Sequence, residues 1–383
     1  MEDSKYKEWF SPSICLTHAC NLNCVYCYQK HDHEKAMTYE TAIKAIDWIF
    51  DNVPEKSEGI AINFIGGEPL LEFKLIQRIY NYVKSKKFSK DYIFFASTNG
   101  TVLTDEMREW FRAHKGDFTL GLSLDGSKET HNRNRSNSYD KIDFDFFLET
   151  YPKQGVKTTL SPSSIETLAE DIIAIHEKGF LHVTGINLAE GDFDWSDEKY
   201  IEELSAQLSI LESYYLHNPQ IPVDQMLDRK LSVCEVEKSP KKWCGIGTNS
   251  QFIDTDGNIY PCPYFTPMTV SKQELEEINN MDFESDNDFI DESCYENCYI
   301  YPVCPSCFGS CYEKNKAFNI RDKSRCRIQK LITLYSADLL AKKILQDENY
   351  IPTEAIFNTI SSIKKIRNMY IKEFPFLIRD SHQ

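Results

Sequence analysis

The chain has 383 residues, and its 43 Lys and Arg against 59 Asp and Glu give a net charge of −16. This balance argues against a nucleic-acid-binding protein and against electrostatic attachment to a membrane, because both need basic surface. No apolar run reaches the ~18 residues of a spanning helix, and no signal peptide is recognisable, so we expect a cytoplasmic protein. With 41% hydrophobic and 27% charged residues, a globular fold of two or three domains is expected.

The first half of the chain alternates short apolar strands with amphipathic helices, which indicates a parallel sheet, open or closed into a barrel. In such folds ligands bind at the carboxyl ends of the strands, and polar or glycine-containing segments follow several strands here. The strands are predicted at 12–17, 59–65, 92–97, 118–124, 157–161 and 181–188, and the helices at 38–52, 75–84, 104–114, 165–178 and 196–217.

From about residue 220 the chain is rich in Pro, Cys, Gly and Asp, which predicts a small domain stapled by metal. Residues 273–296 carry ten acidic side chains and no Lys or Arg. This segment is either a solvated acidic loop or a docking surface for a basic peptide. Helices are predicted at 327–346 and 353–373, and we expect three domains: 1–220, 221–330 and 331–383.

The cysteines are unusual in number and in distribution. Thirteen of them, an odd count, argue against a disulfide framework in a reducing compartment and favour metal ligands. Cys20, Cys24 and Cys27 form one group, and nine others lie between positions 234 and 326, after about 200 cysteine-free residues. We therefore predict two metal regions, with Cys15 in the first strand as a buried structural thiol.

The first group has the spacing Cys-x3-Cys-x2-Cys on the loop after the first predicted strand. Three thiolates can hold three irons of a [4Fe–4S] cluster and leave the fourth iron to an outside ligand. A zinc site completed by His18, His31 or His33 is the alternative that these residue types allow.

With Tyr26 before the third cysteine, this loop resembles the signature of the radical S-adenosylmethionine (SAM) superfamily. In that family SAM binds the fourth iron, and one electron cleaves it to methionine and a 5′-deoxyadenosyl radical that abstracts hydrogen from the substrate. The resemblance covers about residues 12–190 and implies an α/β fold, a partial (β/α)6 parallel barrel. It also implies a reductant such as flavodoxin or ferredoxin.

Further motifs of this family follow the predicted strands. Gly66, Gly67, Glu68 and Pro69 resemble its GGEP motif, whose backbone and acid receive the SAM ammonium. Two glycines allow close approach of the backbone, and a carboxylate can accept from a cation.

The segment Ser123-Leu124-Asp125-Gly126, followed by His131 and Arg135, is similar to the SLDG…H…R pattern of the peptide- and protein-modifying branch. The resemblance implies that Ser123 contacts SAM, that Asp125 lies in the same pocket and that Arg135 binds the SAM carboxylate. A plain Asp-Gly turn is the alternative for Asp125. Weaker candidates for the SAM ribose are Asn99, Ser161 and Asn187.

The second cysteine group resembles the SPASM extension, a small Cys-rich domain with two auxiliary [4Fe–4S] clusters, so that three clusters are implied in all. Cys244-x12-Gly257-x4-Cys262 matches the family pattern, whereas the following cysteines depart from it in spacing. Two zinc sites are the alternative. The implied distal ligands are Cys294, Cys298, Cys304 and Cys326, and the implied proximal ligands are Cys244 and Cys262 with Cys307, Cys311 or both, Cys234 being a spare candidate.

Two kinds of maturase fit these motifs. Anaerobic sulfatase maturases, which form formylglycine, carry a Cys-x5-Cys pair at the start of the extension and an acid after the following cysteine. Here Ser250 and Pro263 occupy those positions, so no general base can be assigned. We therefore favour a maturase that installs a thioether or carbon–carbon cross-link in a ribosomally made peptide.

A peptide epimerase remains an alternative, and a non-catalytic iron–sulfur or zinc protein is the hypothesis from another class. The expected partner of the maturase is a peptide substrate with a leader. Because only about 11 residues precede the first strand, we expect the leader to be bound by another surface of the enzyme or by a separate protein.

Overall fold

The computed structural model describes residues 9–27, 29, 35–189, 193–236, 242, 244–346 and 354–379. The chain divides into two compact units. One comprises Met1–Leu124, His131–Lys157 and Cys244–Ser285, and the other comprises Asp125–Thr130, Thr158–Trp243 and Asp286–Gln383. The three domains expected at 1–220, 221–330 and 331–383 were defined by composition and motifs, whereas these units are defined by compactness. The three domains therefore stay a prediction. No helix in the described part of the chain is long and apolar enough to cross a membrane.

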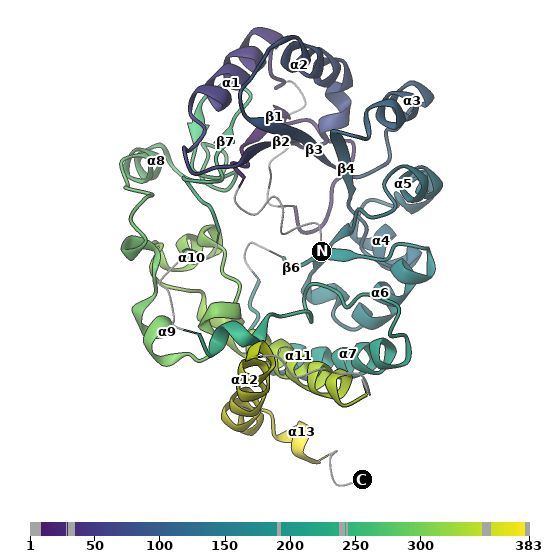
Figure 1. Ribbon diagram of the computed structural model, residues 1–383, viewed down its shortest axis with the longest axis vertical. Coiled ribbons are helices and arrows are strands. Elements are labelled where there is room, and N and C mark those ends of the chain that lie inside the picture. The colour runs from purple at the N-terminus through teal and green to yellow at the C-terminus, as the bar shows by residue number, and fades with distance from the viewer. Residues whose placement is uncertain are drawn as a thin grey trace. The chain divides into compact units, whose positions relative to one another are not determined.

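The first unit is built on parallel strands in the order β4-β3-β2-β1. Helices α1 and α2 lie over one face of this sheet (Figure 1). Thr38 and Thr104 cap α1 and α3 by accepting hydrogen bonds from backbone N–H groups of the first turns. The predicted elements are thereby confirmed: β1 (Ser13–Thr17), α1 (Tyr39–Asp51), β2 (Gly59–Gly66), α2 (Phe73–Ser85), β3 (Asp91–Thr98), α3 (Asp105–His114) and β4 (Phe118–Leu122).

Aromatic side chains fill the space between this sheet and its helices. The ring of Phe94 lies 6.0 Å from that of Phe64 on β2 and 5.6 Å from that of Phe118 on β4, centroid to centroid. Tyr80 of α2 contacts Phe94, and Phe111 of α3 contacts Phe118, each at 5.2 Å. These buried rings fix the strands against the helices, and so they fix the positions of the loops at the strand ends.

Two further predicted strands continue the alternation. β5 (Val156–Leu160) pairs with β6 (Val183–Leu188), and β5 begins beside the end of β4, where the Leu124 N–H donates to the Lys157 carbonyl at 2.9 Å. The mixed α/β fold with parallel strands is confirmed. The following helices are α6 (Leu168–Glu177) and α7 (Glu198–His217), and the segment between β4 and β5 carries two helices that were not predicted, α4 (Lys128–Asn134) and α5 (Phe144–Thr150).

A short hairpin was also missed. β7 (Phe252–Ile253) pairs in parallel with β1, and β8 (Ile259–Tyr260) pairs antiparallel with β7, which extends the sheet to six strands. Gly257 turns the hairpin with a φ of 83°, and its N–H donates to the Asp254 carbonyl at 2.8 Å. This left-handed conformation explains why the cysteine motif has glycine there.

In the second unit, α7 packs against α11 (Cys326–Gln346), which packs against α12 (Glu354–Tyr370). The Ser205 and Tyr335 hydroxyls meet at 2.9 Å between α7 and α11. The predicted closing helices are confirmed, whereas short helices in the cysteine-rich and acidic segments were read as loops. These and the remaining elements are α8 (Lys272–Asn279, first unit), α9 (Glu292–Asn297), α10 (Phe308–Asn315) and α13 (Pro375–Arg379), with 3₁₀ turns at Pro69–Glu72, Tyr139–Lys141, Pro162–Ser164, Leu231–Cys234, Asn287–Phe289, Tyr301–Val303, Lys323–Arg325 and Ile371–Glu373.

Candidate functional site

The first cysteine group lies on the loop that leaves the carboxyl end of β1. Cys20 and Cys24 are half-buried, and Cys27 is exposed. Burial raises the pKa of the Cys20 thiol, and the nearby Glu68 and Cys27 raise it further. Burial also raises the pKa of Cys27, which the positive charge of Arg135 partly offsets. The thiols of Cys20 and Cys27 therefore lie close enough to interact, and Arg135 lies beside Cys27. Together with Cys24 on the same loop, these residues fit a three-cysteine cluster site.

The end of β2 holds this loop in place. The N–H of Gly67 donates to the Thr17 carbonyl, and the N–H of Glu68 donates to the Ala19 carbonyl, both at 2.9 Å. A Cβ atom on Gly66 would lie 2.4 Å from the Thr17 oxygen, and one on Gly67 would lie 2.2 Å from the Ala19 oxygen. Only glycine lets the two segments approach this closely. The GGEP glycines thus position the cysteine loop.

Glu68 joins the end of β2 to the end of β3. Its carboxylate is 1% exposed and accepts hydrogen bonds from the Leu70 N–H at 3.1 Å, the Thr98 hydroxyl at 2.8 Å and the Asn99 N–H at 2.8 Å. Burial raises the pKa of Glu68 from its ordinary 4.5 to about 7, although these donors and Arg135 act in the opposite direction. Pro69 begins the 3₁₀ turn that follows.

Other predicted residues of the first unit gather around the same loop. The Asn99 side chain donates to the Asn21 side chain of the cysteine loop at 2.9 Å. The buried Arg135 guanidinium lies 5.4 Å from the centre of the Tyr26 ring. Ser123 is fixed at the end of β4, where its N–H donates to the Thr98 carbonyl at 2.9 Å. Asn99 and Ser123 therefore lie at strand ends on one edge of the sheet, and Arg135, which follows α4, lies beside Tyr26 of the cysteine loop.

Three other candidates belong to the second unit. Asp125 is buried, and its carboxylate accepts from the Thr159 N–H at 3.3 Å. Ser161 forms a capping box with Ser164, and Asn187 is exposed on β6. Their contacts with SAM stay predictions.

His18 has a structural partner that was not predicted. Its Nε2 lies 2.8 Å from the Asp254 carboxylate, and both side chains are buried. This pairing turns His18 toward the β7–β8 hairpin, which disfavours it as the fourth ligand of a zinc site with the loop cysteines. The other histidines named for that site, His31 and His33, lie outside the described residues.

Cys15 is the buried structural thiol that its place in the first strand predicted. Its Sγ lies within 4.8 Å of ligand atoms of His18 and Asp254. However, it packs in an apolar cluster with Phe252 and Tyr260, and burial raises its pKa to about 12.

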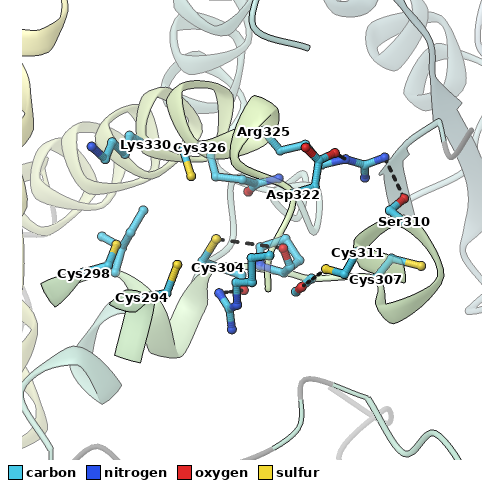
Figure 2. A pocket seen from close by; sticks show the side chains of 15 residues that line it. Cys294, Cys298, Cys304, Cys307, Ser310, Cys311, Asp322, Arg325, Cys326 and Lys330 are labelled. Carbon is cyan, nitrogen blue, oxygen red and sulfur yellow. Dashed lines mark hydrogen bonds and ion pairs between the residues drawn. The ribbon is translucent and has the colours of Figure 1, made fainter. Parts of the chain in front are cut away.

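Six cysteines line a cavity of about 50 Å³ in the second unit. In Figure 2, four of them lie together on one side, and Cys307 and Cys311 lie apart on the other. Burial raises the pKa of Cys326 to about 11, and the charges of its neighbours Cys304, Cys294 and Cys298 add to this effect. Four converging thiolates are a full ligand set for a [4Fe–4S] cluster, so these residues fit the group. The four are those expected at the distal site: Cys294, Cys298, Cys304 and Cys326.

The remaining cysteines do not complete a second set within either unit. Cys262 follows β8 in the first unit, where burial raises its pKa to about 12 and the nearby Cys244 adds to the rise. Cys307 and Cys311 belong to the second unit, as does the buried Cys234. The proximal ligand set stays a prediction.

Comparisons with known proteins agree with this geometry. Residues 14–161 match the family model of the radical SAM superfamily. The radical SAM cyclopropyl synthase TigE of Paramaledivibacter caminithermalis is 24% identical over 356 residues, which cover 83% of this chain and 72% of TigE. A cysteine-type anaerobic sulfatase-maturating enzyme of Clostridium perfringens is 24% identical over 351 residues, 81% of this chain and 91% of that enzyme.

The fold is also similar to a solved structure, native anSMEcpe with bound AdoMet and Kp18Cys peptide. The TM-score is 0.66 at 19% identity, and the match covers 86% of this chain and 98% of that one.

Proposed function

We propose that this radical SAM enzyme of the peptide and sulfatase maturase branch forms a cross-link in a ribosomally made peptide. Its radical SAM domain covers residues 14–161. The new bond is a thioether or a carbon–carbon bond. The observation that carries the proposal is the combination of a three-cysteine loop held by GGEP with a separate group of four converging cysteines.

The residues of the first unit would hold one cluster and SAM. Cys20, Cys24 and Cys27 would ligate a [4Fe–4S] cluster, which supplies the electron that cleaves SAM to methionine and a 5′-deoxyadenosyl radical. Arg135 provides a buried positive charge beside Cys27 and Glu68, where it can bind the SAM carboxylate. Glu68 faces the same region and can accept from the SAM ammonium when it is ionised.

The auxiliary cysteines would hold two further clusters. Cys294, Cys298, Cys304 and Cys326 supply four thiolates by themselves, whereas Cys244 and Cys262 need Cys307, Cys311 or both. Three clusters allow electrons to enter from a protein reductant such as flavodoxin or ferredoxin and to leave the substrate radical. We expect the enzyme to work in the cytoplasm, with a leader-bearing peptide as substrate and, where the leader needs one, a separate leader-binding protein.

Formation of formylglycine is the second candidate function. It is favoured by the similarity to the sulfatase-maturating enzyme over most of both chains. It is disfavoured by Ser250 and Pro263, which stand where the pattern of that branch has a cysteine and an acid. Without that acid, the proton of the substrate thiol or hydroxyl has no assigned acceptor.

Mass spectrometry of a co-expressed peptide distinguishes these functions. The enzyme is produced anaerobically together with a small peptide encoded beside its gene, and the peptide is weighed. We expect a loss of two hydrogen atoms for each cross-link. The variant with Cys20, Cys24 and Cys27 all replaced by Ala is the control, and it should leave the mass unchanged. Formylglycine formation would replace our proposal if a cysteine exchanged its sulfur and two hydrogens for one oxygen, or if the loss of two hydrogens lay on a serine whose new aldehyde reacts with a hydrazide. An unchanged mass with an inverted stereocentre would replace it by epimerisation.

A further inference from the structure

One lysine makes direct contact with the four-cysteine group. Lys323 lies three residues before Cys326, in the 3₁₀ turn Lys323–Arg325. Its Nζ lies 2.7 Å from the Sγ of Cys294, 2.8 Å from the Asp291 carboxylate and 3.3 Å from the Ser293 hydroxyl. The ammonium therefore donates a charge-assisted hydrogen bond to the sulfur of an expected cluster ligand.

Asp291 fixes the position of this ammonium. The carboxylate is the N-cap of α9, where it accepts from the Cys294 N–H at 3.0 Å, and it also accepts from the Arg321 N–H at 2.9 Å. The Asp291 side chain is 6% exposed, and the Lys323 side chain is 49% exposed. A carboxylate held by the backbone of α9 thus orients a lysine that would otherwise be free to move in solvent.

A second cation lies beside Cys304. The Arg321 guanidinium stacks over the Tyr301 ring at 4.2 Å and donates to the Cys304 carbonyl at 3.3 Å. The cavity thus has positive charge beside Cys294 and beside Cys304. Hydrogen bonds to the sulfurs and local charge are two of the factors that set the reduction potential of an iron–sulfur cluster.

We propose that Lys323 is a positioning residue that raises the reduction potential of the cluster held by Cys294, Cys298, Cys304 and Cys326. This inference rests on the proposed function, because it requires an iron–sulfur cluster in this cavity. The reduced cluster carries one more negative charge than the oxidised cluster, and a cation that donates to a ligand sulfur stabilises that reduced state. Lys323 would therefore favour this site as the acceptor of the electron that leaves the substrate.

The test is a redox titration of the anaerobically reconstituted full chain, followed by electron paramagnetic resonance. In Lys323→Met one of the cluster potentials should become more negative, with the reduction equilibrium shifted about tenfold, or about 59 mV for a one-electron step. Lys323→Arg keeps the charge and should retain most of the wild-type potential. Lys330→Met is the matched control: Lys330 lines the same cavity but directs its ammonium to Glu373 at 2.6 Å rather than to a cysteine sulfur, so its loss should shift the potentials less than the loss of Lys323.

The outcomes separate this inference from the proposed function. Unchanged potentials in Lys323→Met, with the iron content of the wild type, would overturn the role of Lys323. Replacement of Cys294, Cys298, Cys304 and Cys326 by Ala should remove about four irons per chain, the content of one cube. If it removed none, the cluster itself would be absent from this cavity, and the proposed function would be wrong at this site.

Discussion

Gly67 lies where the end of β2 approaches the cysteine loop too closely for any side chain to fit. A Cβ atom there would lie 2.2 Å from the Ala19 oxygen and 2.9 Å from the Cys20 Cβ. We therefore expect Gly67→Ala to displace the cysteine loop and to lower the iron content by about four per chain, with loss of SAM cleavage. Gly116→Ala is the control, since its new Cβ would have no atom within 4 Å. Wild-type iron in Gly67→Ala would contradict this role.

Because of its raised pKa, Glu68 should make the free energy of unfolding and the affinity for SAM depend on pH in opposite directions. Because burial raises its pKa to about 7, the folded chain binds more protons than the unfolded chain above about pH 4.5. The contribution of Glu68 to the free energy of unfolding is therefore complete below pH 4.5 and is lost as the pH rises to about 7. Binding of the SAM ammonium needs the ionised carboxylate, so SAM affinity should instead rise over this range, by up to about tenfold per pH unit.

Glu68→Gln removes the ionisable group and should flatten both profiles. Calorimetry of SAM binding and denaturant unfolding of the SAM-free protein, from about pH 5.5 to about pH 7, measure the two trends. A SAM affinity that depends on pH equally in Glu68→Gln and in the wild type would exclude this carboxylate from the SAM site.

At the scale of elements, the β7–β8 hairpin is tied to the cysteine loop through the buried His18–Asp254 hydrogen bond. Asp254→Ala leaves the imidazole and the Thr255 N–H without their acceptor, and we expect it to cost about 2–3 kcal/mol in the free energy of unfolding. Asp254→Asn keeps an acceptor oxygen and should cost less. Asp256 lies two residues after Asp254 and forms an exposed ion pair with Lys35, so Asp256→Ala should cost only about 0–1 kcal/mol in the free energy of unfolding. Equal losses in Asp254→Ala and Asp256→Ala would refute the structural role of the buried pair.

Elements that are long and periodic could be predicted from the sequence, and short ones could not. β1 to β6 and the long helices repeat apolar residues often enough to show their period. β7 and β8 have two residues each, and α9 has six, so none of the three is long enough to show a period of apolar residues. The cysteine loop could be predicted because its three cysteines are close together in the sequence. The contacts of Glu68 with Thr98 and of Lys323 with Cys294 join residues about 30 positions apart, and no local pattern reveals them.

The whole molecule should hold three clusters. Anaerobic reconstitution should give roughly 12 irons per chain, at four per cube. Replacement of Cys20, Cys24 and Cys27 by Ala should leave about eight, because the auxiliary cysteines belong to separate sites. Chemical iron analysis with zinc analysis of the same samples measures this directly. A wild-type content of about four irons together with bound zinc would contradict the auxiliary clusters.

Release of 5′-deoxyadenosine from SAM shows directly whether this chain cleaves SAM by radical chemistry. The reconstituted and reduced enzyme should produce it, and the variant with Cys20, Cys24 and Cys27 replaced by Ala should produce none while it keeps its auxiliary iron. Retained 5′-deoxyadenosine in that variant, or none from the iron-replete wild type, would show that Cys20, Cys24 and Cys27 do not hold a cluster that cleaves SAM.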